Sequence, residues 1–198
     1  TTCTNLINSG TGTLVNGVGW NSGNGGYFTF DGSNDGIRIT GGLSDLNVNE
    51  YTISSWNYST NYSQNGFMFE KTTNNAVNTS YSLFYAGANI INRTYGGRND
   101  LNQTTSTYVS NSRWNSVCST YDGLLKKTYV NGKLTAQVVL DNNTITSNST
   151  GYAFIGAYGN VSGYYFNGRI SVTLVWKRAL SQTEIESQFN AYRWRYGI

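Results

Sequence analysis

Apolar and polar residues alternate with a period of two through most of the chain, as in strands that bury one face. Clusters of Gly, Asn and Ser separate these runs at the spacing expected for an antiparallel sandwich or barrel. The pattern therefore predicts about a dozen short strands. The clearest runs are GYFTF (26–30), YTISSWNYS (51–59), FMFEK (67–71), YSLFYA (81–86), RWNSVCSTY (113–121), KKTYV (126–130) and RISVTLVWK (169–177).

Two turn signals join three of these runs into a meander. Asn131 and Gly132 stand between two alternating runs, and a type I′ hairpin turn needs a positive φ at both of its central residues. The YDG sequence at 121–123 marks the turn before. We therefore expect the strands on either side of these turns to pair in order.

One helix is predicted near the end of the chain, over about residues 181–192. Ser181 and Glu184 have the spacing of a capping box, and Leu180 and Ile185 occupy the flanking positions of a hydrophobic staple. The helix has a narrow apolar face for docking, and we expect it to close one end of the sandwich. Residues 193–198 then form a short tail.

Composition supports a single β-rich domain over residues 1–198. The chain has 23 Gly and no Pro, and only 12% of its residues are charged, against about 25% in ordinary soluble proteins. Aromatic residues make up 15%, which supplies enough apolar area for a core. No run approaches the ~20 apolar residues of a membrane span. The sequence begins with Thr1 and not with Met, as expected of a processed chain or a piece of a longer protein.

Histidine is absent and only two cysteines occur, which narrows the chemistry. The lack of His excludes Ser-His-Asp and Cys-His catalysis and His-ligated zinc. Cys3 and Cys118 match no metal or redox spacing, and whether they form a disulfide stays open.

Five sequence blocks resemble, in order and spacing, the laminin-G-like domains of the concanavalin A-like lectin/glucanase superfamily. They cover about residues 13–190: FDGSND, YTISSWNY, RWNSVCSTYDG, KKTYVNGKL and YFNGRISVTLVWKRALSQTEIESQFN. The resemblance implies a two-sheet antiparallel jelly-roll sandwich that often binds sugars or proteins at a rim of loops and sometimes holds calcium there. Gly36, Ser171 and Val172 depart from the family pattern, where an aromatic and acidic residues are common. The ending QFNAYRWRYGI also resembles such domains in tailed-bacteriophage virion proteins.

Two loops combine aromatic, amide and charged side chains, the mixture that sugar sites use. Residues 91–103 and 156–168 are these loops. Their candidate ligand-binding residues are Tyr95, Arg98, Asn99, Asp100, Tyr158, Asn160 and Tyr164. Because Tyr and Asn are abundant throughout the chain, their presence in loops is also expected without a binding role, and both interpretations stay open.

Residues 31–36 form a candidate turn or calcium site. Asp31, Asn34 and Asp35 could offer oxygen ligands, but calcium wants six to eight of them, and a distant carboxylate such as Asp100, Asp122 or Asp141 would have to complete the shell. Asp and Asn also bond their own backbone in turns. We therefore favour a turn; no cofactor is required, and calcium is the one candidate ion.

Little supports catalysis or nucleic-acid binding. The superfamily includes glucanases that use paired carboxylates, but Glu70 is a lone strand carboxylate here and is expected to be a surface group. The basic, aromatic YRWRYG at 192–197 could stack on nucleic acid, yet docking against the fold or against a neighbouring subunit explains it better.

The sequence thus predicts a non-catalytic recognition or assembly domain on a virion surface, binding a host-surface carbohydrate. The first alternative is a purely structural virion protein that contacts only other virion proteins. The second is a secreted adhesin or carbohydrate-binding module. A homo-oligomer is compatible with each, and neither nucleic acid nor membrane is an expected partner.

Overall fold

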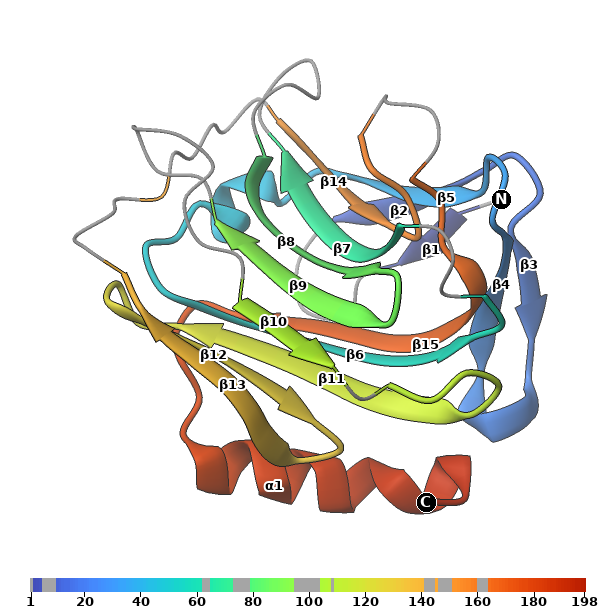
Figure 1. Cartoon of the computed structure of the whole chain (residues 1–198). Helices are drawn as coiled ribbons and strands as arrows, with labels where there is room; N and C mark the ends of the chain where they lie inside the picture. The colour runs from blue at the N-terminus through green and yellow to red at the C-terminus, as the bar shows by residue number, and fades with distance from the viewer. Residues whose placement is uncertain are drawn as a thin grey trace.

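The computed structural model describes residues 2–4, 10–61, 65–72, 79–94, 104–107, 109–140, 145, 151–159 and 164–198. Two antiparallel sheets stack face to face in this part of the chain, with the core between them (Figure 1). The prediction of an all-β, two-sheet sandwich with one short C-terminal helix is confirmed.

The first sheet has eight strands. In spatial order they are β1 (Thr2–Thr4), β2 (Thr11–Val15), β5 (Gly36–Thr40), β14 (Tyr152–Ile155), β7 (Gly66–Thr72), β8 (Thr79–Ala86), β9 (Asn89–Thr94) and β10 (Thr104–Thr107). The late strand β14 lies between β5 and β7, so the chain crosses between the sheets as in a jelly roll.

The second sheet has seven strands. They are β13 (Lys133–Val139), β12 (Leu125–Val130), β11 (Trp114–Tyr121), β6 (Tyr51–Ser59), β15 (Asn167–Trp176), β4 (Tyr27–Asp31) and β3 (Gly19–Asn21). Each of the seven clearest sequence runs coincides with a strand, and the described part has fifteen strands in place of the expected dozen. Short 3-10 turns lie at η1 (Gly23–Gly25), η2 (Leu43–Leu46) and η3 (Arg193–Tyr196).

The predicted meander is present. Asn131 and Gly132 have φ of 50° and 79°, the pair of positive values that a type I′ turn requires. Strand β11 pairs with β12, and β12 with β13. At the preceding turn, the Asp122 carboxylate accepts hydrogen bonds from the N–H groups of Leu124 and Leu125.

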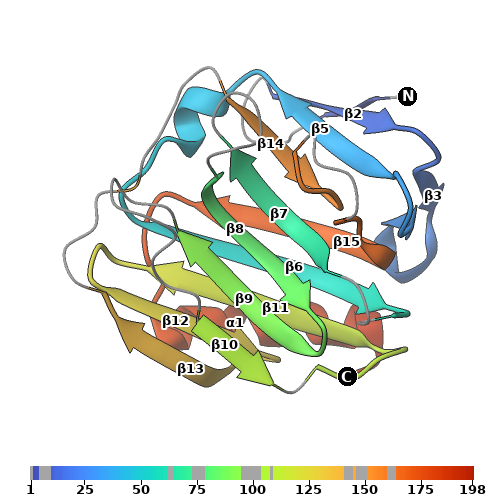
Figure 2. The same cartoon turned by 45° about the horizontal axis from the view of Figure 1, so that its top comes forward.

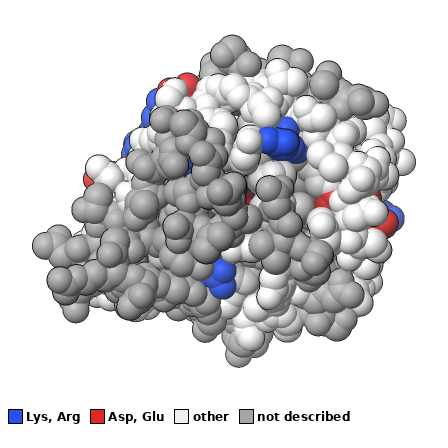
Figure 3. All heavy atoms as spheres, turned by 90° about the horizontal axis from the view of Figure 1, so that it is seen from above, with Lys and Arg blue, Asp and Glu red and all other residues white. Residues whose placement is uncertain are grey.

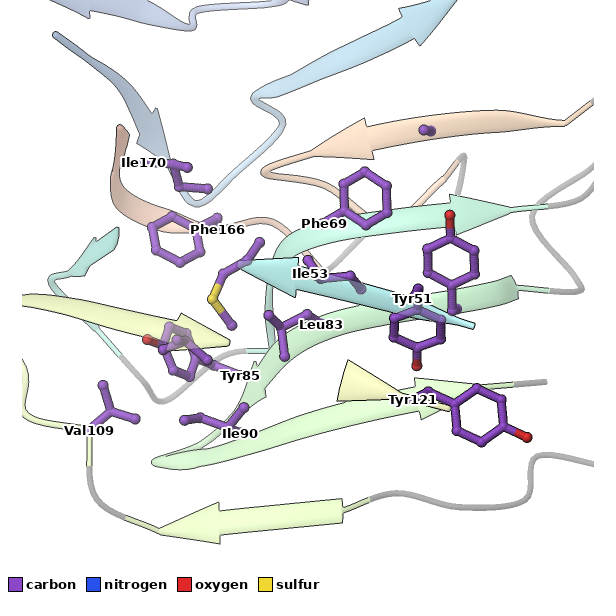
Figure 4. Close-up of a cluster of buried hydrophobic side chains, with 14 of the residues drawn as sticks. Tyr51, Ile53, Phe69, Leu83, Tyr85, Ile90, Val109, Tyr121, Phe166 and Ile170 are labelled. Carbon is purple, nitrogen blue, oxygen red and sulfur yellow. The ribbon is translucent and has the colours of Figure 1, made fainter. Parts of the chain in front are cut away.

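Aromatic and aliphatic side chains from both sheets fill the space between them (Figure 4). Buried tyrosines satisfy their hydroxyls inside this core. Tyr51 donates to the Asn92 side-chain oxygen at 2.8 Å, and Tyr85 donates to the Asn57 side-chain oxygen. Burial raises the pKa of the Tyr51 hydroxyl, so it stays protonated as a donor.

The bulge at Met68 breaks the alternation of β7. Phe67 pairs with Phe84, but Phe69 pairs with Leu83, which leaves Met68 as an extra residue. Met68 and Phe69 therefore both join the central core, while Phe67 belongs to a separate cluster on the outer side of the sheet.

Helix α1 (Gln182–Tyr192) begins where the capping box predicts. The Ser181 hydroxyl accepts a hydrogen bond from the Glu184 N–H, and the Glu184 carboxylate accepts one from the Ser181 N–H. Hydrogen bonds from the Arg178 guanidinium are the largest cause that lowers the pKa of Glu184 to about 2, followed by those from Ser181. The capping carboxylate is therefore charged at neutral pH. No helix in the described part is long and apolar enough to cross a membrane.

The helix does not close an end of the sandwich, as its sequence position suggested. It lies along the outer face of the seven-stranded sheet (Figures 1 and 2). Leu180 and Ile185 pack with Cys118 and Tyr129, because alternate residues of β11 and β12 point away from the core and leave apolar side chains to cover. Cys118 is a free thiol buried there, and burial raises its pKa, which makes it unreactive.

The C-terminal tail packs against the same face. The Tyr196 ring stacks on Trp56 with centroids 4.3 Å apart, and its hydroxyl lies 2.8 Å from the Ser171 hydroxyl. Arg195 donates to the Gly25 carbonyl at 2.8 Å. The YRWRYG segment thus docks against the fold of its own chain, one of the two partners expected for it. Trp194 points outward and is 74% exposed.

We predict that Tyr196→Ala lowers the free energy of unfolding by about 3 kcal/mol, because it removes a buried ring. Trp194→Ala is the matched control and should change that free energy by less than about 0.5 kcal/mol. Urea unfolding followed by tryptophan fluorescence measures both. Equal effects of the two substitutions would contradict the docking of the tail.

Candidate aromatic binding pocket

The outer face of the eight-stranded sheet carries a small pocket where β7, β8 and β9 run side by side (Figure 2). Its volume is about 130 Å³, enough for one ring-sized group. Two segments outside these strands complete it, the one after β14 and the one before β15. Its lining residues are Asn65, Phe67, Phe84, Arg93, Tyr158 and Tyr164.

Strand register sets the pocket floor. Phe67 pairs with Phe84 across β7 and β8, and their rings stack with centroids 4.3 Å apart and planes 5° from parallel. Phe84 in turn pairs with Ile91 on β9. Because the bulge at Met68 turns Phe67 outward, this apolar row lies on the outer face instead of joining the core.

Two tyrosines form a wall above this floor. An isolated antiparallel bridge between Ala157 and Tyr165 brings the neighbouring residues Tyr158 and Tyr164 together. Their rings meet edge to face with centroids 5.6 Å apart. The ring centroid of Tyr158 lies 4.9 Å from that of Phe67, and Tyr164 is 37% exposed. A ligand entering the pocket would meet ring faces and edges together.

A second row, one step along the strands, supplies charge. Glu70 pairs with Ser82, and Ser82 pairs with Arg93. The Arg93 guanidinium carbon lies 4.7 Å from the centroid of Phe84, so the cation covers one side of the floor. Its planar N–H groups suit hydroxyl, carboxylate or carbonyl oxygens of a ligand.

Glu70 is fully buried and holds the wall in place, contrary to its expected position on the surface. One of its carboxylate oxygens accepts a hydrogen bond from the Gly159 N–H at 2.6 Å. Gly159 directly follows Tyr158, so this charged hydrogen bond fixes the backbone that carries the tyrosine. Among the described residues, the pocket lining contains no carboxylate.

Of the residues proposed from sequence, the structure brings Tyr158 and Tyr164 together in this pocket. The other five, Tyr95, Arg98, Asn99, Asp100 and Asn160, lie outside the described residues. Sequence reasoning missed Asn65, Phe67, Phe84 and Arg93. The one signal for Phe67 and Phe84 was the aromatic content of FMFEK and YSLFYA, which the sequence predicts as strands.

The charges visible on this face are few. Seen from above, the described surface shows separate Lys or Arg and Asp or Glu side chains among mostly uncharged atoms (Figure 3). Recognition here would therefore depend on ring contacts and on individual polar groups, since the described atoms form no continuous charged patch.

The stretch around Asp31 and Asp35 has the geometry of a turn. The buried Asp35 carboxylate accepts hydrogen bonds from the N–H groups of Gly17, at 2.7 Å, and Asp31, at 3.0 Å. The Asp31 carboxylate accepts from the N–H groups of Ser33 and Asn34. The Asn34 carbonyl accepts from the Asn16 amide.

These bonds explain the stretch without an ion. Both carboxylates accept hydrogen bonds from backbone N–H groups, the pattern by which Asp stabilises a turn. Asp122, one of the distant carboxylates that could have completed a shell, accepts from its own turn. Within the described residues, no group of three or more His, Cys, Asp or Glu could hold a metal ion.

We predict that Glu70→Gln speeds hydrogen exchange of the Gly159 N–H about tenfold. The neutral Gln side chain is a weaker hydrogen-bond acceptor than the charged Glu70 carboxylate, so the bond opens more often. NMR hydrogen exchange at that amide provides the measurement. Glu50→Gln, at an exposed position, should leave the rate unchanged. An unaltered rate in the Glu70 variant would mean that the carboxylate does not hold the wall.

In its fold, the sandwich is similar to solved structures of neurotoxin receptor-binding domains. The binding domain of botulinum neurotoxin serotype G matches with a TM-score of 0.76 and 16% identity, over 94% of this chain and 47% of that one. The receptor-binding domain of the C/D mosaic serotype matches with a TM-score of 0.76 and 15% identity, over 93% and 47%. The chain spans about half the length of these structures.

A third match is the binding domain of botulinum neurotoxin DC, solved in complex with rat synaptotagmin II, at a TM-score of 0.74 and 14% identity, over 94% and 48%. At such identities the likeness concerns the fold alone. No curated protein matches the sequence. A laminin G family model described as the concanavalin A-like lectin/glucanases superfamily matches residues 31–186, most of the chain. The chain therefore belongs to the concanavalin A-like lectin/glucanases superfamily.

Proposed function

We propose that this domain is a non-catalytic receptor-binding module that holds a cell-surface glycan in the aromatic pocket. One observation carries the proposal. Tyr158 and Tyr164, distant in sequence from Phe67 and Phe84, converge with them around a cavity of about 130 Å³.

The chemistry of the lining suits a pyranose. The apolar face of a sugar ring packs against aromatic rings, and Phe67, Phe84 and Tyr158 present such rings at stacking distance from one another. Sugar hydroxyls need donors and acceptors at the rim, which Asn65 and Arg93 supply. The cavity size favours one sugar unit inside, with the rest of a chain extending outward.

The neurotoxin domains support a receptor-binding role for this fold. One was solved with rat synaptotagmin II and another with SialylT, so a protein or a ligand of that kind binds those domains. For the present chain we favour a glycan, because the pocket is narrow and ring-lined, whereas protein interfaces extend over a much broader surface.

A binding role without catalysis also fits the carboxylates. Glycoside hydrolysis needs two carboxyl groups beside the scissile bond. Glu70 is buried beneath the wall and accepts a hydrogen bond from the Gly159 N–H, and the described residues of the lining add no second acid.

The virion surface is the location that we propose, from the likeness of QFNAYRWRYGI to the ends of phage domains. A second candidate function is assembly through protein contacts only, and the exposure of Trp20 (60%) and Trp194 (74%) favours it. Large apolar side chains left in water are typical of surfaces that meet a partner. A secreted adhesin or carbohydrate-binding module is the remaining alternative.

We predict saturable binding of the isolated domain to a subset of glycans on an array. Tyr164→Ala should weaken it at least about fivefold, since it removes a wall ring, and Trp194→Ala should leave it unchanged. Chelator should have no effect, because the carboxylates of Asp31 and Asp35 already accept backbone hydrogen bonds.

Two results would count against these statements. Loss of binding with chelator would show that the turn holds calcium. No binding by a folded sample, as judged by its thermal unfolding, would reject the glycan and favour the assembly function.

The proposed location has its own test. Mass spectrometry of purified phage particles from the source of this sequence should find tryptic peptides of this chain, such as residues 170–177. Their presence in culture supernatant but not in particles would favour the secreted adhesin.

A further inference from the structure

A second aromatic cluster with a cation lies on the opposite side of the molecule, on the outer face of the seven-stranded sheet. Arg169 of β15 pairs with Tyr58 of β6. The Arg169 guanidinium carbon lies 4.6 Å from the Tyr58 ring centroid and 5.3 Å from that of Tyr27. Trp114 completes the cluster, with its ring centroid 5.7 Å from Tyr27 and 5.9 Å from Tyr58.

The cluster collects hydrogen-bond donors that the protein does not use. Within the described part of the chain, the Arg169 guanidinium, the Tyr27 and Tyr58 hydroxyls and the Trp114 indole N–H make no hydrogen bond or ion pair. Yet Tyr27 is only 9% exposed and Trp114 only 6%. Their rings are thus held by packing, while their polar atoms are left for water or a ligand.

Within the described residues Arg169 pairs with no carboxylate, in contrast to two neighbouring cations of the chain. Arg178 pairs with Glu184 and Lys177 pairs with Asp45. Arg169 instead rests on two tyrosine rings, which restrict its motion without occupying its in-plane N–H groups. Such a fixed planar fork matches the two oxygens of a carboxylate.

We propose that this cluster is a second binding site, which takes the carboxylate of an acidic sugar. Arg169 holds the carboxylate, and the sugar ring lies against the exposed part of the Tyr58 ring, with the Tyr58 O–H and the Trp114 N–H donating to its hydroxyls. Only a ligand with both an anion and a polar ring uses all of these donors. The site is separate from the pocket on the other sheet and does not depend on its function.

The test uses the whole chain, labelled with ¹⁵N, and follows arginine side-chain Nε–H signals while D-glucuronate is added. Arg169→Lys identifies the Arg169 signal by its loss. We expect that signal to shift and saturate in the millimolar range with glucuronate, and to stay in place with D-glucose. Sodium sulfate, a compact anion without a ring, should bind at least about tenfold more weakly.

Variants then separate the site from its surroundings. Saturation-transfer NMR on glucuronate should show at least about tenfold weaker binding to Arg169→Gln, because two charged hydrogen bonds are lost. Tyr58→Phe keeps the ring and the packing and should weaken binding by about two- to fivefold. Arg38→Gln is the matched control, since Arg38 also lies over a tyrosine, Tyr152, at 3.8 Å, but on the other sheet. It should bind as the unaltered chain does.

Several outcomes would overturn the proposal. An Arg169 signal that is unmoved at about 50 mM glucuronate would mean that there is no site. An equal response to glucose would show that the carboxylate is not recognised. Equal affinity for sulfate would show that the sugar ring contributes nothing to binding. Unchanged binding by a folded Arg169→Gln variant would place the ligand elsewhere.

Discussion

The bulge at Met68 is the constraint on which the outer face of the eight-stranded sheet depends. A regular β7 would send Phe67, Phe69 and Lys71 to one side of the sheet, because side chains alternate. The extra residue changes that phase, so Phe69 enters the core while Phe67 and Glu70 are free to serve the outer face. From there Phe67 stacks on Phe84 to form the pocket floor, and Glu70 accepts from Gly159 to fix the pocket wall. One inserted residue therefore separates structural side chains from those available for binding.

The two outer faces of the sandwich differ in how their apolar side chains are covered. The seven-stranded sheet has large apolar side chains on its outside, such as Trp56 and Tyr129, and helix α1 with the C-terminal tail removes them from water. Among the described residues no helix lies over the part of the eight-stranded sheet where β7, β8 and β9 meet, and the outer apolar row ends there in a pocket. The helix thus covers one sheet, and the described residues form a pocket on the other.

Local sequence signals predicted the elements they act on. Asn131-Gly132 gave its hairpin, and Ser181 with Glu184 gave the start of the helix, because each signal reflects backbone geometry within a few residues. The position of the helix was wrong, since it depends on which sheet exposes apolar residues outward. The prediction that Glu70 lies on the surface was also wrong. FMFEK alternates well enough to hide the bulge, and Gly159, which donates to the Glu70 carboxylate, is far away in sequence.

The candidate site also combines residues that local sequence signals predict with residues that only the fold brings together. Tyr158 and Tyr164 could be predicted because a loop rich in Tyr, Asn and Gly is a common place for sugar contacts. Phe67, Phe84 and Arg93 could not, since they lie in strands whose aromatic residues are normally assigned to a core. Only the strand register shows that their faces turn outward and meet the two tyrosines. The sequence thus indicated the wall of the pocket, and the floor required the three-dimensional pairing.

Low charge makes the surroundings of each cation informative. With 12% charged residues and a net charge of +3, the chain has few carboxylates with which to neutralise its arginines. Arg38, Arg93 and Arg169 each lie over an aromatic ring, which restrains the guanidinium group. A protein that needed these cations only for folding would gain as much from paired surface charges, which are easier to place. Rings hold Arg93 beside the proposed pocket and Arg169 at the proposed second site, on opposite sheets, so the two proposals together would let one domain contact two oxygen-rich ligands at once.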